Sequence, residues 1–157
     1  MTRSPRTSIR LRRALPTDVR FLFRLRNDPS VRKQFKNTKP VRYADHVRWL
    51  AQTLTRADRV LFIGVDGRDK PFGQLRFDRA GQRVDISISL ATPARGKGLS
   101  VPFLLRGIAT LRRKMPRRIW FRAHIKRTNP ASRAVFLRAG FVRYAGNGSW
   151  IYLRKRT

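Results

Sequence analysis

The chain has 157 residues, of which 41% are hydrophobic, including 10 Phe, 3 Trp and 3 Tyr. This is the size of one ordinary domain with enough apolar side chains for a core, so wholesale disorder is excluded and we expect a single domain over residues 1–157. The lack of cysteine excludes disulfides and thiolate nucleophiles, and the two distant histidines do not have metal-ligand spacing. No apolar stretch reaches the length of a membrane span, and residues 1–13 lack a signal-peptide core, so we expect a cytoplasmic protein.

The formal net charge is +30, because 30 Arg and 8 Lys face 8 Asp and no Glu. This excess has two interpretations. A biased codon pool raises the charge everywhere without any selected partner, whereas an anionic partner such as nucleic acid or a nucleotide-linked substrate selects for a positive field. The basic residues are spread along the whole chain, which favours nonspecific contact with nucleic acid over a dedicated surface.

Residues 8–15 are predicted to form a first strand, and Pro16-Thr17-Asp18 then supplies cap chemistry for a helix. Val19, Leu22 and Phe23 share one face of that helix. No repeat, low-complexity tract or flexible linker interrupts the chain after it.

A second helix is predicted to begin after Tyr43. Val47, Leu50 and Leu54 recur at helical spacing and form its predicted buried stripe. This assignment places His46 and Trp49 toward a neighbouring face.

Three consecutive strands are predicted over residues 60–65, 71–78 and 84–90, separated by turns at 66–69 and 80–82. The third strand alternates strictly between apolar and polar residues. Its apolar face consists of Val84, Ile86, Ile88 and Leu90, and its polar face of Asp85, Ser87 and Ser89. The polar face of this strand is therefore a candidate for chemistry.

The C-terminal part is predicted to contain a helix from about residue 101 to a break at 114–116, a strand over 119–125, and a second helix. Asn129 and Pro130 stand where an N-cap and an N1 proline belong, and Gly140 follows as a C-terminal cap residue. Residues 141–144 and 149–154 are predicted to close the chain as a hairpin.

The segment LATPARGKGLS, residues 90–100, joins the end of a strand to the start of a helix through paired glycines. Backbone N–H groups at such a turn approach a phosphate closely, and Arg95 and Lys97 add full positive charges. The alternative is that Gly96 and Gly98 only permit a tight turn. The segment is neither a Walker loop nor a dinucleotide-binding fingerprint.

With Arg95, Gly98 and Ser100, this turn resembles the Arg/Gln-x-x-Gly-x-Gly/Ala loop of the GNAT superfamily of acyl-CoA N-acyltransferases, although Ser100 departs from the usual Gly or Ala. A second segment, residues 123–141, is similar to the family through Asn129, Ser132, Gly140 and Phe141 at the matching spacings.

The resemblance implies an α+β fold. Its sheet is mixed and mostly antiparallel, with about seven strands, helices on both faces and a splayed central strand pair. It also implies an acetyltransferase with acetyl-CoA as the acyl donor, an acceptor-side half at 1–80 and a CoA-binding half at 81–157. The implied cofactor-binding residues are Leu90, Ala91, Thr92, Arg95, Gly96, Lys97, Gly98, Leu99, Ser100, Asn129, Ser132 and Phe136.

The N-terminal half resembles the branch of this superfamily that acetylates nucleotide-linked deoxyamino sugars for surface polysaccharide biosynthesis. The similarity is carried by residues 25–29, Arg32, Phe35, Asn37, His46, Trp49 and the strand at 73–78. It implies a substrate site formed by Arg26, Asn27, His46, Trp49 and Arg76, in which arginines suit phosphates and an aromatic ring suits a base.

Two other functions stay open at this point. One is acetylation of peptide or ribosomal-protein N-termini or of small amines, and the other is a nucleic-acid-binding protein on an inactive transferase scaffold. Either a monomer or a homodimer fits the sequence.

The reaction requires removal of an ammonium proton and stabilisation of an oxyanion. Asp85 is the first candidate base because it lies on the polar strand face, and His124 has the better intrinsic pKa. In this superfamily a tyrosine often acts as general acid at the position of Phe136, which cannot donate a proton. The thiol can leave as thiolate, or Tyr144, Tyr152, Ser87 or water can supply the proton. Backbone N–H groups near residues 90–92 are expected to meet the oxyanion.

Overall fold

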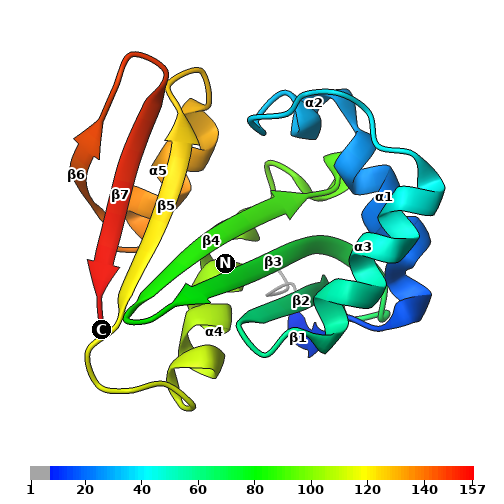
Figure 1. The fold of residues 1–157 in the computed structure, drawn as a ribbon, viewed down its shortest axis with the longest axis horizontal. Helices are drawn as coiled ribbons and strands as arrows, with labels where there is room; N and C mark the ends of the chain where they lie inside the picture. Colours follow the sequence, from blue (N-terminus) through cyan, green and yellow to red (C-terminus); the bar gives the residue numbers. More distant parts are fainter. Residues whose placement is uncertain (1–7) are drawn as a thin grey trace, which may run out of the picture.

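The computed structural model describes residues 8–157, which form one seven-stranded sheet with helices on both faces (Figure 1). The elements in chain order are β1 (Arg10–Arg13), η1 (Pro16–Asp18), α1 (Val19–Asn27), α2 (Pro29–Arg32), α3 (Tyr43–Thr55), β2 (Arg59–Val65), β3 (Pro71–Ala80), β4 (Arg83–Leu90), η2 (Thr92–Ala94), α4 (Ser100–Arg112), β5 (Trp120–Lys126), α5 (Pro130–Arg138), β6 (Val142–Gly146) and β7 (Trp150–Arg156). The predicted α+β class is confirmed.

The strand order is β1-β2-β3-β4-β5-β7-β6, and all neighbours are antiparallel except β4 and β5. β4 and β5 pair in parallel over three residues, 83–85 with 120–122, and then diverge. In Figure 1 the two strands form the arms of a V, with α4 and α5 behind the sheet. The predicted splayed strand pair is therefore present.

Two apolar clusters hold helices against the two faces of the sheet. The larger cluster lies under α4 and α5 and spans both arms of the V, with Phe77 and Phe121 in edge contact at 6.1 Å between ring centroids. The smaller cluster joins Leu22 of α1 and Leu50 of α3 to β2. Because β2 is buried on both faces, its sequence is a continuous apolar run rather than an alternating one.

The predicted buried stripe of α3 is wrong in part. Val47 is 40% exposed, whereas His46 and Thr53 are buried with Leu50. The inner face of α3 packs beside a cavity and beside Arg59, whose guanidinium donates to the Thr53 hydroxyl at 3.3 Å. The inner face of this helix therefore combines the apolar Leu50 with the polar His46 and Thr53, and hydropathy alone could not indicate it.

Local signals at the second C-terminal helix are confirmed. The Asn129 side chain accepts from the N–H of Ser132 at 3.2 Å, Pro130 stands at the first helical position, and Gly140 has φ +88°. The predicted cap chemistry at 16–18 is present, but at η1: Asp18 accepts from the N–H of Leu15 at 2.7 Å and also pairs with Arg12, and its side chain makes no cap hydrogen bond to α1. The short helix α2 was not predicted.

Three strands differ from their predicted ranges by one or two residues at each end. β1 is shorter than predicted, and β6 and β7 begin one residue later and end two residues later. None of the helices within residues 8–157 combines the length and the apolar character needed to cross a membrane.

Candidate active site

A cleft of about 820 Å³ lies between the diverging strands β4 and β5. From Ile86 to Leu90, the edge of β4 that faces β5 has no strand partner, since the pairing with β5 stops at Asp85. Residues of β4, β5, α4 and α5 line this cleft, together with the segment that follows α1. An extended ligand can therefore pair with free backbone groups along β4.

The glycine turn at the mouth of the cleft has the geometry of an anion cradle. Gly96 and Gly98 have φ +69° and +68°, and no atom lies within 4 Å of where a Cβ would stand on either. Within residues 8–157, the N–H groups from Gly96 to Ser100 have no hydrogen-bond acceptor. Free donors at the start of the 13-residue helix α4 suit the phosphates of CoA.

The Arg95 side chain makes two hydrogen bonds within the protein. Its Nε donates to the carbonyl of Leu90 at 3.1 Å, and its Nη1 donates to the Ser30 hydroxyl at 2.7 Å. Lys97 is exposed and makes no side-chain hydrogen bond within the described chain. The charge available to a phosphate in this turn is therefore mainly that of Lys97.

Most of the predicted cofactor residues line the cleft, namely Leu90, Arg95, Gly96, Gly98, Ser100, Asn129, Ser132 and Phe136. Ala91, Thr92, Lys97 and Leu99 do not. The N–H of Ala91 donates to the carbonyl of Phe72 at 2.8 Å, so it is not available to an oxyanion. The Thr92 hydroxyl donates to Asp28 at 3.1 Å, and the Leu99 side chain is buried in the larger cluster.

Both candidate bases line the cleft, one on each arm of the V. The Asp85 carboxylate receives two hydrogen bonds from Arg122, at 2.8 and 3.0 Å, so an ion pair already occupies it. Partial burial lowers the pKa of His124; Arg122 and Lys36 act in the same direction, and Asp85 opposes them. His124 is consequently neutral at pH 7 and able to accept a proton.

Among the candidate proton donors, Ser87 lines the cleft. The Tyr152 hydroxyl accepts from Asn147 at 3.1 Å, and Tyr144 packs against Arg154 on the outer face of the sheet. Phe136 is buried against Phe141, with 5.0 Å between ring centroids. Its apolar ring can only pack beside the ligand.

A second cavity of about 370 Å³ lies under α1 and α3. Four of the five predicted substrate residues line it, namely Arg26, His46, Trp49 and Arg76. The fifth, Asn27, lies outside. Its side-chain amide holds the backbone of Val41 by two hydrogen bonds, at 2.8 and 3.0 Å, and so fixes the loop before α3.

Two polar groups of this cavity are buried without a partner in the described chain, Nη1 of Arg26 and Nε2 of His46. The Arg26 guanidinium stacks 4.3 Å above the Phe35 ring and donates to the carbonyl of Asn37 at 3.1 Å. Desolvation, with Arg32 and Arg76 nearby, lowers the pKa of Arg26. Desolvation and Arg26 likewise lower the pKa of His46, which stacks on Trp49 at 5.1 Å. Groups buried without partners are costly, so these two need a polar partner within the cavity, which a water molecule or a polar ligand supplies.

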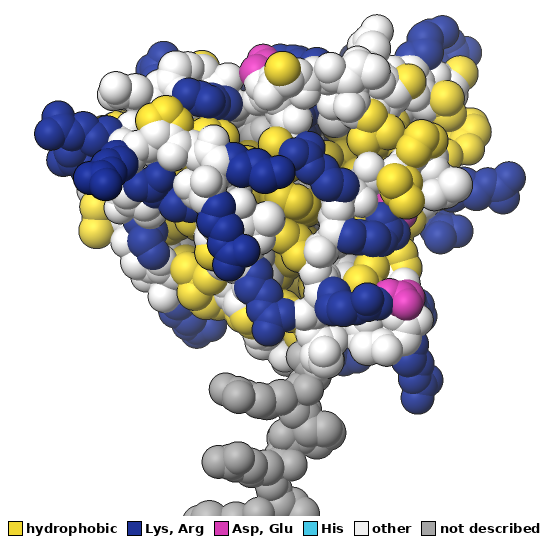
Figure 2. Space-filling view, turned by 90° about the horizontal axis from the view of Figure 1, so that it is seen from below, with side chains coloured by type: hydrophobic (Ala, Val, Ile, Leu, Met, Phe, Trp, Pro, Cys, Tyr) yellow, Lys and Arg dark blue, Asp and Glu magenta, His cyan; other side chains and the backbone are white. Residues whose placement is uncertain are grey.

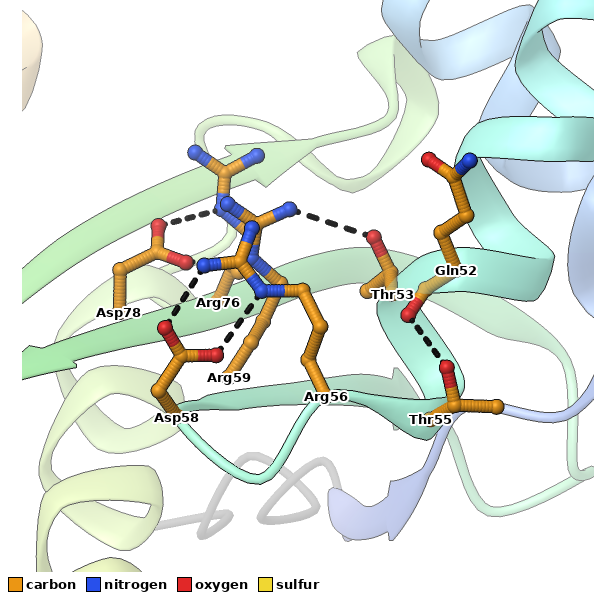
Figure 3. A network of polar contacts seen from close by, with 8 residues as sticks. All are labelled: Gln52, Thr53, Thr55, Arg56, Asp58, Arg59, Arg76 and Asp78. Carbon is orange, nitrogen blue, oxygen red and sulfur yellow. Dashed lines mark hydrogen bonds and ion pairs between the residues drawn. The ribbon is translucent and has the colours of Figure 1, made fainter.

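Arg76 is held by a polar network at the end of α3 and the start of β2 (Figure 3). Asp78 accepts from Arg76 at 2.9 Å and also pairs with Arg59, which reaches Thr53. Burial lowers the pKa of Arg76, against the attraction of Asp78. Asp78 thus fixes the position of the Arg76 guanidinium where the two cavities meet.

Residues 28–36, which follow α1, belong to the site, although none of them was predicted as a site residue. Val31 and Phe35 line both cavities, together with Arg76 and Ser89. The Lys126 ammonium donates to the carbonyl of Lys33 at 2.7 Å, so this segment bridges from the β4 arm to the β5 arm. Asp28 as N-cap followed by Pro29 was the available signal for α2.

The split sheet, the anion cradle at the start of α4 and the polar cavity beside the split together define an acyl-CoA N-acetyltransferase. The family model described as acetyltransferase (GNAT) domain matches residues 8–142. The chain therefore belongs to the GNAT acetyltransferases, which use acetyl-CoA as the acyl donor. No curated protein sequence matches it.

Solved structures agree in fold. A spermidine N-acetyltransferase from Vibrio cholerae, in complex with CoA and spermine, is 17% identical with a TM-score of 0.79, over 95% of this chain and 94% of that chain. A phosphinothricin acetyltransferase from Sinorhizobium meliloti, in complex with AcCoA, is 17% identical with a TM-score of 0.78, over 94% and 88%. A domain from Methanocaldococcus jannaschii is 20% identical with a TM-score of 0.79, over 96% and 99%.

Proposed function

We propose that the protein transfers the acetyl group of acetyl-CoA to the amino group of a nucleotide-linked amino sugar. The observation that carries this proposal is the 370 Å³ cavity, in which Nη1 of Arg26 and Nε2 of His46 are buried without partners. Guanidinium groups bind phosphate oxygens in pairs, and an aromatic ring such as Trp49 suits a sugar or base face.

The charge of the cavity favours an anionic acceptor. Arg26 and Arg76 contribute positive charge, and Asp45, the one carboxylate among its described lining residues, pairs with Arg48. A polycation such as spermidine would meet like charges there, with no free carboxylate to offset them. The acceptor named for the Vibrio cholerae structure therefore does not suit this cavity.

The residues at the junction of the two cavities arrange the reaction. Bound acetyl-CoA supplies the acetyl group as a thioester. The free N–H groups from Gly96 to Ser100 and the charge of Lys97 hold phosphates, while the β4 edge from Ile86 to Ser89 offers backbone partners to an extended chain. Ser89 and Arg76 line both cavities, so an amine held beneath α3 meets the cleft at the polar face of β4.

His124 is the proposed proton acceptor, either directly or through water. It lies in the cleft and is neutral at pH 7, whereas the carboxylate of Asp85 is engaged by Arg122. Asp85 then has a positioning role. It holds Arg122 by two hydrogen bonds, and its negative charge stabilises the protonated form of His124. The thiol leaving group needs no strong acid, because a thiol departs readily as thiolate.

An acceptor panel tests the proposal. The purified protein is incubated with acetyl-CoA and one acceptor at a time. The acceptors are nucleotide-linked amino sugars, the matching sugars without an amine, peptides with free N-termini, and spermidine. Only the nucleotide-linked amino sugars are expected to release free thiol and to gain the mass of one acetyl group. If peptides were acetylated and none of the amino sugars were, the proposal would be overturned.

A further inference from the structure

The half-sheet formed by β5, β7 and β6 has one face without a helix. α5 packs behind these strands, and their other face is open in the view of Figure 1. The inward residues of β5 and β7, which include Phe121, Ile125 and Leu153, are buried in the larger cluster. The alternate residues therefore point to the open face.

The strand register brings aromatic and basic side chains together on that face. Trp120 stands opposite Arg156, His124 opposite Tyr152, and Lys126 opposite Trp150. We call this the aromatic-basic face, and it consists of Trp120, Arg122, His124, Lys126, Tyr144, Trp150, Tyr152, Arg154 and Arg156.

These side chains form a continuous layer. The Arg154 guanidinium lies 4.3 Å from the Trp120 ring and 4.9 Å from the Tyr144 ring. Tyr144 is 6.3 Å from Tyr152, and Tyr152 is 4.8 Å from His124, between ring centroids. Aromatic and guanidinium planes are thus spread along strands of seven residues, a length of about 20 Å.

The face carries positive charges and has no free carboxylate among its residues. No acidic residue follows Asp85 in the sequence, and the Asp85 carboxylate is already paired with Arg122. The wider surface is also rich in Lys and Arg, as Figure 2 shows for another side of the molecule. What distinguishes the aromatic-basic face is that cations and aromatic rings lie side by side on one face of the sheet.

We propose that the aromatic-basic face binds single-stranded nucleic acid. Bases that are free of a duplex stack on aromatic and guanidinium planes, and the cations follow the phosphates. Several rings along about 20 Å exceed what one nucleotide covers and match a strand of several nucleotides. A second copy of this chain would bring like charges together. This inference does not depend on the identity of the acetyl acceptor.

The face also continues into the active site. His124, Lys126 and Trp150 belong to the aromatic-basic face and line the cleft as well. A strand bound along β5 therefore extends from Trp120, where β5 still pairs with β4, to the part of the cleft that Lys126 and Trp150 line. Binding there would compete with an acceptor that enters from the same side.

The test is fluorescence anisotropy of the full-length protein with labelled single-stranded oligouridine of twelve nucleotides and with an RNA duplex of equal length. We expect tighter binding of the single strand, and a loss of about fivefold or more on Tyr144→Ala. Arg154→Gln should weaken binding and reduce the slope of log K against log salt by about 0.7, whereas Tyr144→Ala should leave the slope unchanged.

Arg113→Gln is the matched control, because Arg113 is exposed at the end of α4 and makes no side-chain hydrogen bond within residues 8–157. Circular dichroism melting checks the fold of each variant. Equal affinity for duplex and single strand, or equal losses in Arg113→Gln and Arg154→Gln with none in Tyr144→Ala, would show diffuse charge attraction and overturn the proposal. A change of oligomeric state in Tyr144→Ala without loss of oligouridine binding would also overturn it.

Discussion

At the scale of single residues, Arg26 is the side chain most clearly prepared for a ligand, because its Nη1 is buried without a partner. Arg26→Gln is expected to lower kcat/KM for the acceptor by about ten- to a hundredfold, which corresponds to about 1.5–3 kcal/mol for a hydrogen bond to a charged group. The dissociation constant of acetyl-CoA should not change. Arg24→Gln, on the exposed side of the same helix, is the control and should leave both values unaltered.

His124 carries the expected pH dependence. Its pKa is lowered, so the neutral base predominates at pH 7 and is lost as the pH falls through that lowered pKa. We expect kcat, which reports the ternary complex, to decrease as the pH falls through this lowered pKa, and His124→Gln to remove this dependence and to lower kcat by about 10²- to 10⁴-fold. If Asp85→Asn removed the acid limb while His124→Gln kept it, Asp85 would be the base.

At the scale of elements, the turn before α4 should bind phosphate through its backbone. Gly98→Trp and Gly81→Trp place a side chain at φ +68° and +62°, in open space in both cases, so both should lose about 1–2 kcal/mol of stability. Only Gly98→Trp should abolish acetyl-CoA binding, measured by titration calorimetry, because its side chain fills the cradle. Unchanged affinity in Gly98→Trp would falsify the placement of the phosphates.

The segment 28–36 couples the two cavities through the hydrogen bond from Arg95 to Ser30. Ser30→Ala removes an acceptor for a charged donor and is expected to raise KM for the acceptor by about tenfold, since Val31 and Phe35 then lose their fixed position. Steady-state kinetics with varied acceptor measures this. Ser149→Ala, in an exposed turn, is the matched control, and equal effects of the two substitutions would contradict the coupling.

At the scale of the whole molecule, the larger cluster joins both arms of the V, so the halves should unfold together. Phe121 is fully buried in contact with Phe77, and Phe121→Ala is expected to cost about 3–5 kcal/mol and to lower Tm by roughly 10 °C. Circular dichroism should show one transition, with loss of CoA binding at the same midpoint. Leu137→Ala, at a 48% exposed position, should change Tm little. Two separate transitions would contradict a single cooperative unit.

The sequence by itself determined the order and type of the main elements, the alternation of β4, the cap at Asn129 and the glycine turn. These features depend on neighbouring residues, on periodicity and on the φ range that glycine permits, and all of them can be seen in a short stretch of chain. Of the five residues that the resemblance implied for a substrate site, four share one cavity.

Only the tertiary structure decided which of these residues are free to act. Arg95, Asp85 and Asn27 bond to Ser30, Arg122 and Val41, each remote in sequence, so their engagement depends on packing. The inward turn of His46 depends on the cavity under α3, and the aromatic-basic face depends on the register of β5 against β7. Long-range pairing creates these environments, because partners are chosen by proximity in the fold and not by spacing along the chain.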